Sequence, residues 1–414
     1  MKRILFILLL SVIGLHGFAQ LTLQQIHDMA RQHYPVIKQY QLVSQSKEYT
    51  LDNAVKAYLP QIKISMGANV FTKMVEFPVQ TAALIGDTKN HLLNASVQVN
   101  QMIYDGGATS VQKKMAAAQA TVDENQLNVR MYDINRQVDQ LFFSILLFDE
   151  QLRQVKLLQD DLALGRKTVE GLMNGGLANA SDLDAVEVEQ IQANQQEGSL
   201  LASRKAYLRM LGLFIGRELS DSTAFERPTP LEPSLADATQ RPELMYFAAQ
   251  SKLLDEQRKM LDVQLKPKLS AFALGSYQSK VFDFMKNQMV AGGLSLSWNI
   301  APLYTRKNDL KLLETKQQQI ESEREAFLFN NRLQNEQLRG VVDDLKEKIG
   351  QDDRIIALRE NIRAKSSKKV QNGIETVNEM LRDVNAVSQA RQQKAIHEIL
   401  LLQEIYQIKN INNN

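Results

Sequence analysis

The feature that most constrains the fold of this chain is an internal repeat. Four prolines mark it: Pro35, Pro60, Pro242 and Pro267. The members of each pair are 25 residues apart, and the two pairs are separated by 207 residues. Further along, an offset of 197 relates Gly176 to Gly373. Several matched features in one order, with a single change of offset, indicate that one structural plan occurs twice in the 414 residues.

Each copy of the plan predicts a helix, a strand, a loop, a second strand, a very long helix, a glycine turn and a final helix. In the first repeat, residues 20–212, the strands, long helix and tip turn are expected at about 61–75, 94–104, 107–173 and 174–180. A proline-bearing linker, 213–239, follows. In the second repeat, residues 240–414, the same elements are expected at about 268–278, 290–300, 303–370 and 371–375.

Two short patterns place helix starts in the first repeat. Thr22-x-x-Gln25 is a capping box for the first helix. Ser181-x-x-Asp184 has the same form and predicts the start of the helix that follows the first tip turn.

The long helices are predicted from runs that lack proline and keep heptad-like spacing. Between Gly107 and Met173 there is no proline, and apolar residues recur at steps of three, four and seven. At a rise of about 1.5 Å per residue, such a helix is on the order of 100 Å long, which a compact globular domain cannot hold. An ordinary cytoskeletal-type coiled coil would share this spacing. It would have neither the pairs of strands nor a secretory signal peptide at its N-terminus.

The strands alternate apolar and polar residues. Every second residue is apolar in both repeats: Ile62, Ile64 and Met66 in the first, and Leu294, Leu296 and Trp298 in the second. An apolar and a polar face over about ten residues are typical of a transmembrane β-strand. A sheet in a bilayer must close, because unpaired edges find no water there, and four strands are too few to enclose a lumen. If these strands span, several chains therefore share one barrel; the alternative is a small soluble sheet that caps the helices.

Two aromatic residues mark the expected ends of the strands. Tyr104 and Trp298 lie where a strand gives way to a helix. In a membrane barrel this is the level of the interfacial aromatic girdle, so both are candidate membrane-interface residues.

The first nineteen residues predict a secretory signal peptide, with a basic start at Lys2-Arg3, an apolar core, and Ala19 at the cleavage site. Its removal would leave equal numbers of basic and acidic residues, which argues against nucleic acid as a partner. The chain has no cysteine, and none of its 5 histidines lie three or four residues apart. We therefore expect no metal site and no cofactor.

With these features in place, the chain resembles the TolC-like outer-membrane efflux protein family. The resemblance covers about 21–409 and rests on the duplicated order and on a few short stretches. These are Leu21-Thr22-Leu23, Tyr34-Pro35, Tyr58-Leu59-Pro60, Tyr104-Asp105-Gly106-Gly107, and Gly176 through Asp182-Leu183-Asp184-Ala185.

The resemblance implies a homotrimer in the outer membrane with a large periplasmic portion. Three chains of four strands each would form one transmembrane β-barrel, and the long helices would continue it as a coiled-coil barrel. Such proteins dock to a periplasmic adaptor and to an inner-membrane transporter of the RND or ABC type. The implied function is a passive conduit, in contact with outer-membrane lipid, for efflux or type I secretion.

The resemblance also places the closed aperture and the adaptor contacts at the two tip turns. The candidate tip residues are Gly176, Asp182, Asp184, Gly373, Glu375, Glu379, Arg382 and Asp383. In the second repeat the family pattern has Asp six and nine residues after the glycine. Here those positions are Glu379 and Arg382, with Asp383 adjacent. An acidic ring, an intersubunit ion pair and ordinary solvated charges all remain open.

Two other function classes fit the sequence less well. A secreted or periplasmic coiled-coil protein, structural, adhesive or adaptor-like, would not need duplicated strand pairs. An enzyme is not expected, because glycine pairs such as Gly175-Gly176 and Gly292-Gly293 lack the phosphate-loop pattern.

Overall fold

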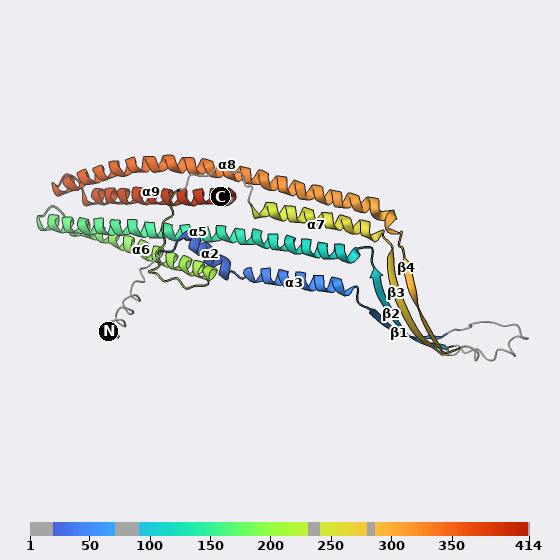
Figure 1. Cartoon of the computed structure of the whole chain (residues 1–414). Helices are drawn as coiled ribbons and strands as arrows, with labels where there is room; N and C mark the ends of the chain where they lie inside the picture. Colours follow the sequence, from blue (N-terminus) through green and yellow to red (C-terminus); the bar gives the residue numbers. More distant parts are fainter. Residues whose placement is uncertain (1–19, 71–90, 231–240, 280–285, 413–414) are drawn as a thin grey trace, which may run out of the picture. The chain divides into compact units, whose positions relative to one another are not determined.

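The computed structural model describes residues 20–70, 91–230, 241–279 and 286–412. The predicted signal peptide, 71–75 of the first predicted strand and 231–239 of the predicted linker lie outside these residues. The chain divides into two compact units (Figure 1). We call Met1–Gln39, Leu127–Leu244 and Glu325–Asn414 the helical unit, and Tyr40–Gln126 and Met245–Arg324 the strand unit.

Two helices run through both units. They are α5, Ala108–Asn174, and α8, Pro302–Gln371, of 67 and 70 residues. Neither has an internal proline: Pro302 is the first residue of α8, where its fixed φ fits a helix start and its missing N–H is no loss. Both helices agree closely with the long helices expected from the heptad spacing.

Each long helix is followed by a shorter one that lies beside it in the helical unit (Figure 1). These are α6, Ala180–Ile215, and α9, Val377–Asn412. Both have 36 residues, and both begin and end at positions related by the offset of 197. The internal repeat of the sequence therefore corresponds to a repeat of the secondary structure.

The four helices share a hydrophobic core near their tips. It draws on α5, α6, α8 and α9 and contains Leu158, Leu162, Val169, Leu172, Val186, Ala193, Val370, Val377, Met380, Leu381 and Val384. Residues from both repeats enter this core, so burial of apolar surface holds the two helix pairs together.

The short helix α2, Leu23–His33, packs against the rest of the helical unit. Its predicted capping box is confirmed: the Thr22 hydroxyl accepts a hydrogen bond from the N–H of Gln25, whose side chain accepts one from the N–H of Thr22. His27 contacts the buried carboxylate of Asp139 on α5 at 2.5 Å. A polar contact therefore ties α2 to α5.

Two helix ends in the first repeat differ from the prediction. Helix α6 starts after Asn179, not near Ser181, because the Asn179 side chain accepts from the N–H of Asp182. It continues beyond 212 to Ile215 and ends at Gly216, whose φ of 65° gives the left-handed cap that favours glycine.

The strand unit holds one four-stranded sheet and most of α3, Ile37–Lys56, and of α7, Pro242–Gln264. The strands are β1, Gln61–Val70, β2, His91–Tyr104, β3, Lys268–Gln278, and β4, Gln288–Ser297. Neighbours in the order β1-β2-β3-β4 pair antiparallel, and β2 with β3 joins the two repeats (Figure 1). β1 and β4 are the edge strands.

The register sorts the side chains onto two faces. Ile64, Val97, Gly275 and Val290 form one row across the sheet. Because neighbouring residues of a strand point to opposite faces, the next row lies on the other side. That row is Ser65, Ser96, Ser276 and Met289.

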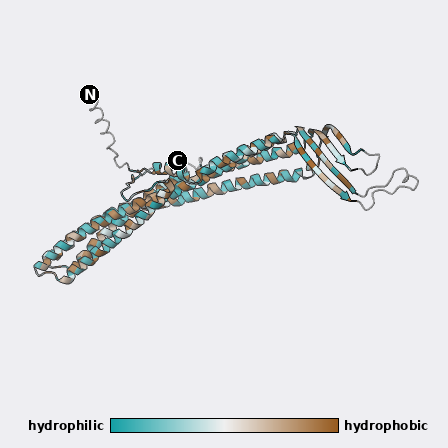
Figure 2. Cartoon of the chain, turned by 90° about the horizontal axis from the view of Figure 1, so that it is seen from below, coloured by the Kyte–Doolittle hydropathy of each residue, from teal (hydrophilic) through white to brown (hydrophobic). Residues whose placement is uncertain are grey.

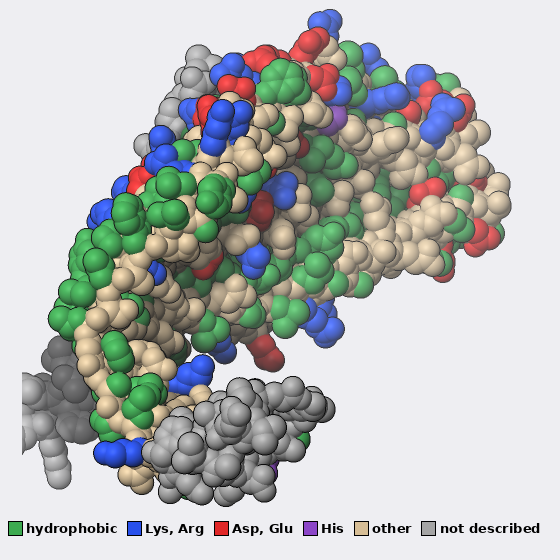
Figure 3. All heavy atoms as spheres, turned by 90° about the vertical axis from the view of Figure 1, so that its right-hand side faces the viewer, with side chains coloured by type: hydrophobic (Ala, Val, Ile, Leu, Met, Phe, Trp, Pro, Cys, Tyr) green, Lys and Arg blue, Asp and Glu red, His purple; other side chains and the backbone are tan. Residues whose placement is uncertain are grey.

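We call these two surfaces the apolar face and the polar face. The apolar face includes Ile62, Ile64, Met66, Val70, Leu93, Val97, Val99, Val290, Leu294 and Leu296. The polar face includes Lys63, Ser65, Asn94, Ser96, Gln98, Asn100, Lys268, Ser270, Ser276, Gln278, Ser295 and Ser297, with Phe272 and Leu274 among them. The alternation is visible along the strands in Figure 2, and Figure 3 shows hydrophobic side chains gathered on one side of the sheet.

The last strand ends at Ser297, three residues before the predicted end at 300. The Asn299 side chain accepts a hydrogen bond from the N–H of Ala301 at 3.1 Å, which turns the chain into α8.

No helix among the described residues combines the length and the apolar character needed to cross a membrane.

Candidate functional site

The two tip turns have the same backbone geometry. In the first, Gly176 has φ 73° and the N–H of Leu177 bonds to the carbonyl of Leu172 at 2.8 Å. In the second, Gly373 has φ 69° and the N–H of Ile374 bonds to the carbonyl of Lys369 at 2.9 Å. This six-to-one bond after a left-handed residue is the Schellman ending of a helix, and it explains why both turns carry glycine.

Both helices that leave the turns are capped in the same way. Asn179 and Asp182 exchange side chain-to-backbone bonds of 2.9 and 3.2 Å. Thr376 and Glu379 exchange bonds of 2.9 and 3.3 Å. The two boxes are related by the offset of 197. Two predicted tip residues, Asp182 and Glu379, therefore stabilise the start of their own helices.

Glu375, which follows the second turn, is paired within its own tip. Lys369 donates to the carboxylate of Glu375. This hydrogen bond lowers the pKa of Glu375 below its usual range and raises the pKa of Lys369. The hydrogen bonds from Thr376 likewise lower the pKa of Glu379. Both shifts favour the charged form of the carboxylate.

Arg382 and Asp383 lie beside a groove of about 710 Å³ between α6, α8 and α9. Glu189 and Arg359 also line it. Arg382 is exposed and Asp383 half-buried, and no ion pair joins either to another described residue. In the first repeat, Asp184 is exposed.

An ion-pair network above the tips was not predicted from the sequence. Arg363 of α8 donates to Asp161 of α5 at 2.5 Å. Arg391 of α9 lies 3.7 Å from Asp161 and donates to Glu360 of α8 at 2.6 Å. We call these four residues the inter-repeat network, because one carboxylate of the first repeat holds two arginines of the second.

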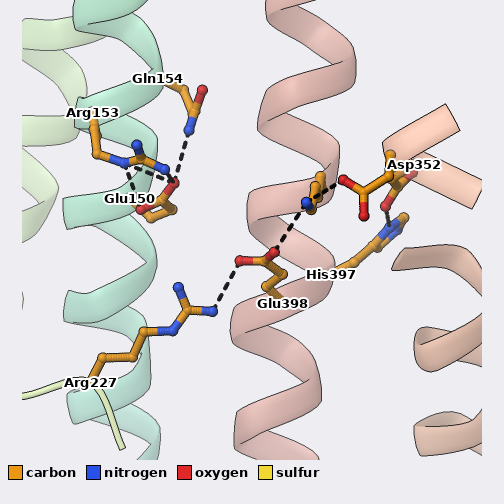
Figure 4. Close-up of polar contacts among 9 residues, drawn as sticks. Glu150, Arg153, Gln154, Arg227, Asp352, His397 and Glu398 are labelled. Carbon is orange, nitrogen blue, oxygen red and sulfur yellow. Dashed lines mark hydrogen bonds and ion pairs between the residues drawn. The ribbon is translucent and has the colours of Figure 1, made fainter. Parts of the chain in front are cut away.

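A second set of polar contacts lies farther along the same helices (Figure 4). His397 of α9 bonds to the buried Asp352 of α8 at 2.7 Å. The next residue, Glu398, accepts a hydrogen bond from Arg227 at 3.0 Å. These contacts tie α9 both to α8 and to the segment that follows α6.

The junction between β2 and α5 is organised by Asp105. Its carboxylate accepts from the N–H groups of Gly107 at 2.8 Å and Thr109 at 2.6 Å, and so caps α5. Burial raises the pKa of Asp105, but the hydrogen bonds from Thr109, Tyr58 and Gly107 outweigh it and lower the pKa to about 2. Asp105 is a residue of the quoted family stretch whose role the sequence left undefined.

The two predicted interface aromatics lie at the helix-side end of the sheet, and both are exposed. Tyr104 ends β2 and is 48% exposed; Trp298 follows β4 and is 66% exposed. The indole N–H of Trp298 donates to the carbonyl of Leu265 at 2.8 Å. An exposed ring with a satisfied polar atom suits a membrane interface.

A scan of protein-family models and a search of curated proteins found no match. Solved structures match over nearly the whole chain. The outer membrane protein VceC of Vibrio cholerae is 12% identical with a TM-score of 0.67, and the match covers 94% of this chain and 96% of that one. CusC is 12% identical with a TM-score of 0.72, covering 95% and 92%. The MtrE outer membrane channel of Neisseria gonorrhoeae is 11% identical with a TM-score of 0.66, covering 95% and 89%.

The chain has the TolC-like fold. This confirms the fold class expected from the sequence: long helices, four antiparallel strands per chain and an internal duplication. At such low identity the likeness is one of fold, and the roles of individual tip residues stay predictions.

Within the TolC-like fold, the structure separates the predicted tip residues into two groups. Gly176 and Gly373 form the turns, and Asp182 and Glu379 cap helices. Glu375 pairs with Lys369, whereas Arg382, Asp383 and Asp184 form no ion pair with any described residue. The offset of 197 could have found both capping boxes, because it aligns Asn179 with Thr376.

Proposed function

We propose that this chain is one subunit of a homotrimeric outer-membrane channel, a passive conduit for efflux or type I secretion with no catalytic role. The observation that carries this proposal is the four-stranded sheet with an apolar face. Ile64 and Leu296 on that face are 66% and 72% exposed, a degree of apolar exposure that soluble proteins rarely spread over a whole sheet.

The open edges of the sheet support the trimer. β1 and β4 each pair on one side only among the described strands. In a bilayer these edges must find partners, because the hydrocarbon core offers none. Pairing β4 of one chain with β1 of the next, three times around, closes a barrel.

The helical tips support a partner in the periplasm. Leu177 and Ile374, at matched positions of the two turns, are 61% and 71% exposed. We propose that the tips dock a periplasmic adaptor that connects the channel to an inner-membrane transporter of the RND or ABC type. VceC, CusC and MtrE share this fold at the level of the whole chain.

The charges around the second turn support a gate. Three copies of Arg382 and Asp383 would surround one axis, and rings of charge at a constriction set ion preference. We propose that these residues, rather than Glu379, line the narrow end, because Glu379 is bound to Thr376 of its own chain.

The experiment that tests the proposal joins fractionation, mass and conductance. The protein should need detergent for extraction, show a trimer mass in mild detergent, and give single-channel currents in planar bilayers. Recovery as a soluble protein without detergent would contradict it and favour the secreted coiled-coil alternative. A detergent-stable monomer that conducts ions would contradict the shared barrel alone.

A further inference from the structure

The charged side chains on the polar face of the sheet are all positive. Lys63 on β1 and Lys268 on β3 are its only charged side chains within the described strands, and both are exposed. The four strands, as described, contain no Asp or Glu. The whole chain, by contrast, has 49 basic and 47 acidic residues. The positive charge is thus a local property of this face.

The two lysines are not neutralised within the strand unit. No ion pair of the described residues includes Lys63 or Lys268. The neighbours that the register gives them are neutral: Gln98 lies beside Lys63, and Ser297 beside Lys268. The carboxylate that follows β2, Asp105, is buried and bound to N–H groups of α5.

The rest of this face can bind anions as well as cations. Serine, asparagine and glutamine side chains offer both donors and acceptors, so they add no preference of their own. The sign of the fixed charge then decides which ions this face prefers. Rings of lysine favour anions, and a low-dielectric wall focuses their field.

We propose that the polar face is an anion-selective lining and that the cargo of the channel consists of small organic anions, such as carboxylates and sulfonates. The inference rests on the proposed function, because the polar face surrounds a lumen only in the closed barrel. Three copies of each lysine then face the same water-filled space, and an anion loses less hydration there than at a tight binding site.

The first test measures ion preference in planar bilayers under a KCl gradient. Near 0.01 M salt the screening length is about 30 Å, so the field of the lysines reaches across the lumen; near 0.15 M it is about 8 Å. We expect a reversal potential that shows chloride preference at low salt and shrinks at high salt. The double variant Lys63→Gln/Lys268→Gln should lose most of this preference. Its matched control, Lys63→Arg/Lys268→Arg, keeps the charge and should retain it.

The second test follows the cargo class. Liposomes that carry the protein should release an anionic sulfonated fluorescein severalfold faster than a cationic rhodamine of similar size, and the glutamine variant should bring the two rates together.

The outcomes separate this inference from the proposed function. A conducting channel with cation preference, or one whose reversal potential the glutamine variant leaves unchanged, overturns the anion lining and leaves the conduit standing. Absence of any current or dye release from the parent protein in both assays removes the conduit and the lining together.

Discussion

The tips of the two repeats share one backbone conformation but differ in their charged side chains. The position of Lys369 in the second tip corresponds to the buried Leu172 in the first, and that of Glu375 corresponds to Ala178, which packs on the core. Arg382 and Asp383 correspond to Ala185 and Val186. The glycine turn and the helix cap occur in both tips, because each chain reversal needs a left-handed residue and each new helix needs an acceptor for its first N–H groups.

The difference teaches which parts of the tip are free to specialise. Where the first tip buries apolar side chains, the second carries an ion pair and two further charges. We therefore expect the first repeat to act as a fixed support and the second as the part that responds to charge, salt and pH.

The largest effect should arise where the repeats are alike, on the sheet. Ile64→Lys in the first repeat and Leu296→Lys in the second place a charge on the apolar face, which costs roughly 2–4 kcal/mol at the bilayer midplane. Both should reduce assembly in the outer membrane by a similar amount. The matched controls Ser65→Lys and Ser295→Lys lie on the polar face and should assemble. Assembly is measured as heat-modifiable trimer in outer-membrane fractions; equal loss in all four variants would refute the assigned faces.

The next effect concerns the caps, which the repeats also share. Asn179→Ala and Thr376→Ala each remove a side-chain acceptor from a helix start, at a cost of about 1 kcal/mol. Hydrogen exchange should accelerate in the first turns of α6 and α9, respectively. Ser181→Ala is the control, because this serine fits a capping pattern in the sequence but is not the cap. Faster exchange in the Ser181 variant would place the helix start where the sequence predicted it.

A smaller effect should distinguish the repeats through matched arginines. Arg363 reaches across to Asp161 of the first repeat. Arg166, at the matching position, bonds within the first repeat, to Glu170 of its own helix at 3.1 Å and to Gln190 of α6 at 3.3 Å. Partly exposed ion pairs contribute about 0–1 kcal/mol. Arg363→Ala should still raise single-channel conductance, because it removes a tie between the repeats, while Arg166→Ala should match the parent. The comparison fails if the two variants conduct alike.

The smallest effect should come from pH at the second tip. The pKa values of Glu375 and Glu379 are lowered in the folded protein, so their contribution is fully present above the usual glutamate value of about 4.3 and is lost as pH falls through the lowered values. Hydrogen exchange at the start of α9 should therefore increase in this acidic range. The increase should be smaller in Glu375→Gln, which has already lost the charged partner of Lys369. An unchanged acid response in that variant would exclude the ion pair as its cause.

Much of the fold could be predicted because it depends on local periodicity. The heptad spacing gave α5 and α8, and the alternation around Ile64 and Leu296 assigned the two faces that the register shows. Helix ends were less certain, because Asn179-x-x-Asp182 and Ser181-x-x-Asp184 both fit a capping box and only the backbone decides between them.

The inter-repeat network could not be predicted for a different reason. Asp161 and Arg363 are 202 positions apart in sequence, and their contact depends on how α5 and α8 are rotated about their own axes. The spacing of apolar residues gives the buried side of each helix, but not which charges at its border face each other.

The two open edges of the sheet have a consequence for mixtures of intact and defective subunits. In the proposed trimer every chain supplies a third of the barrel wall and pairs with both of its neighbours. One chain whose edge strands cannot pair therefore leaves the barrel open. The fraction of intact channels then falls as the third power of the fraction of intact chains. A strand-defective allele that still trimerises through its helices should therefore be dominant over the normal one.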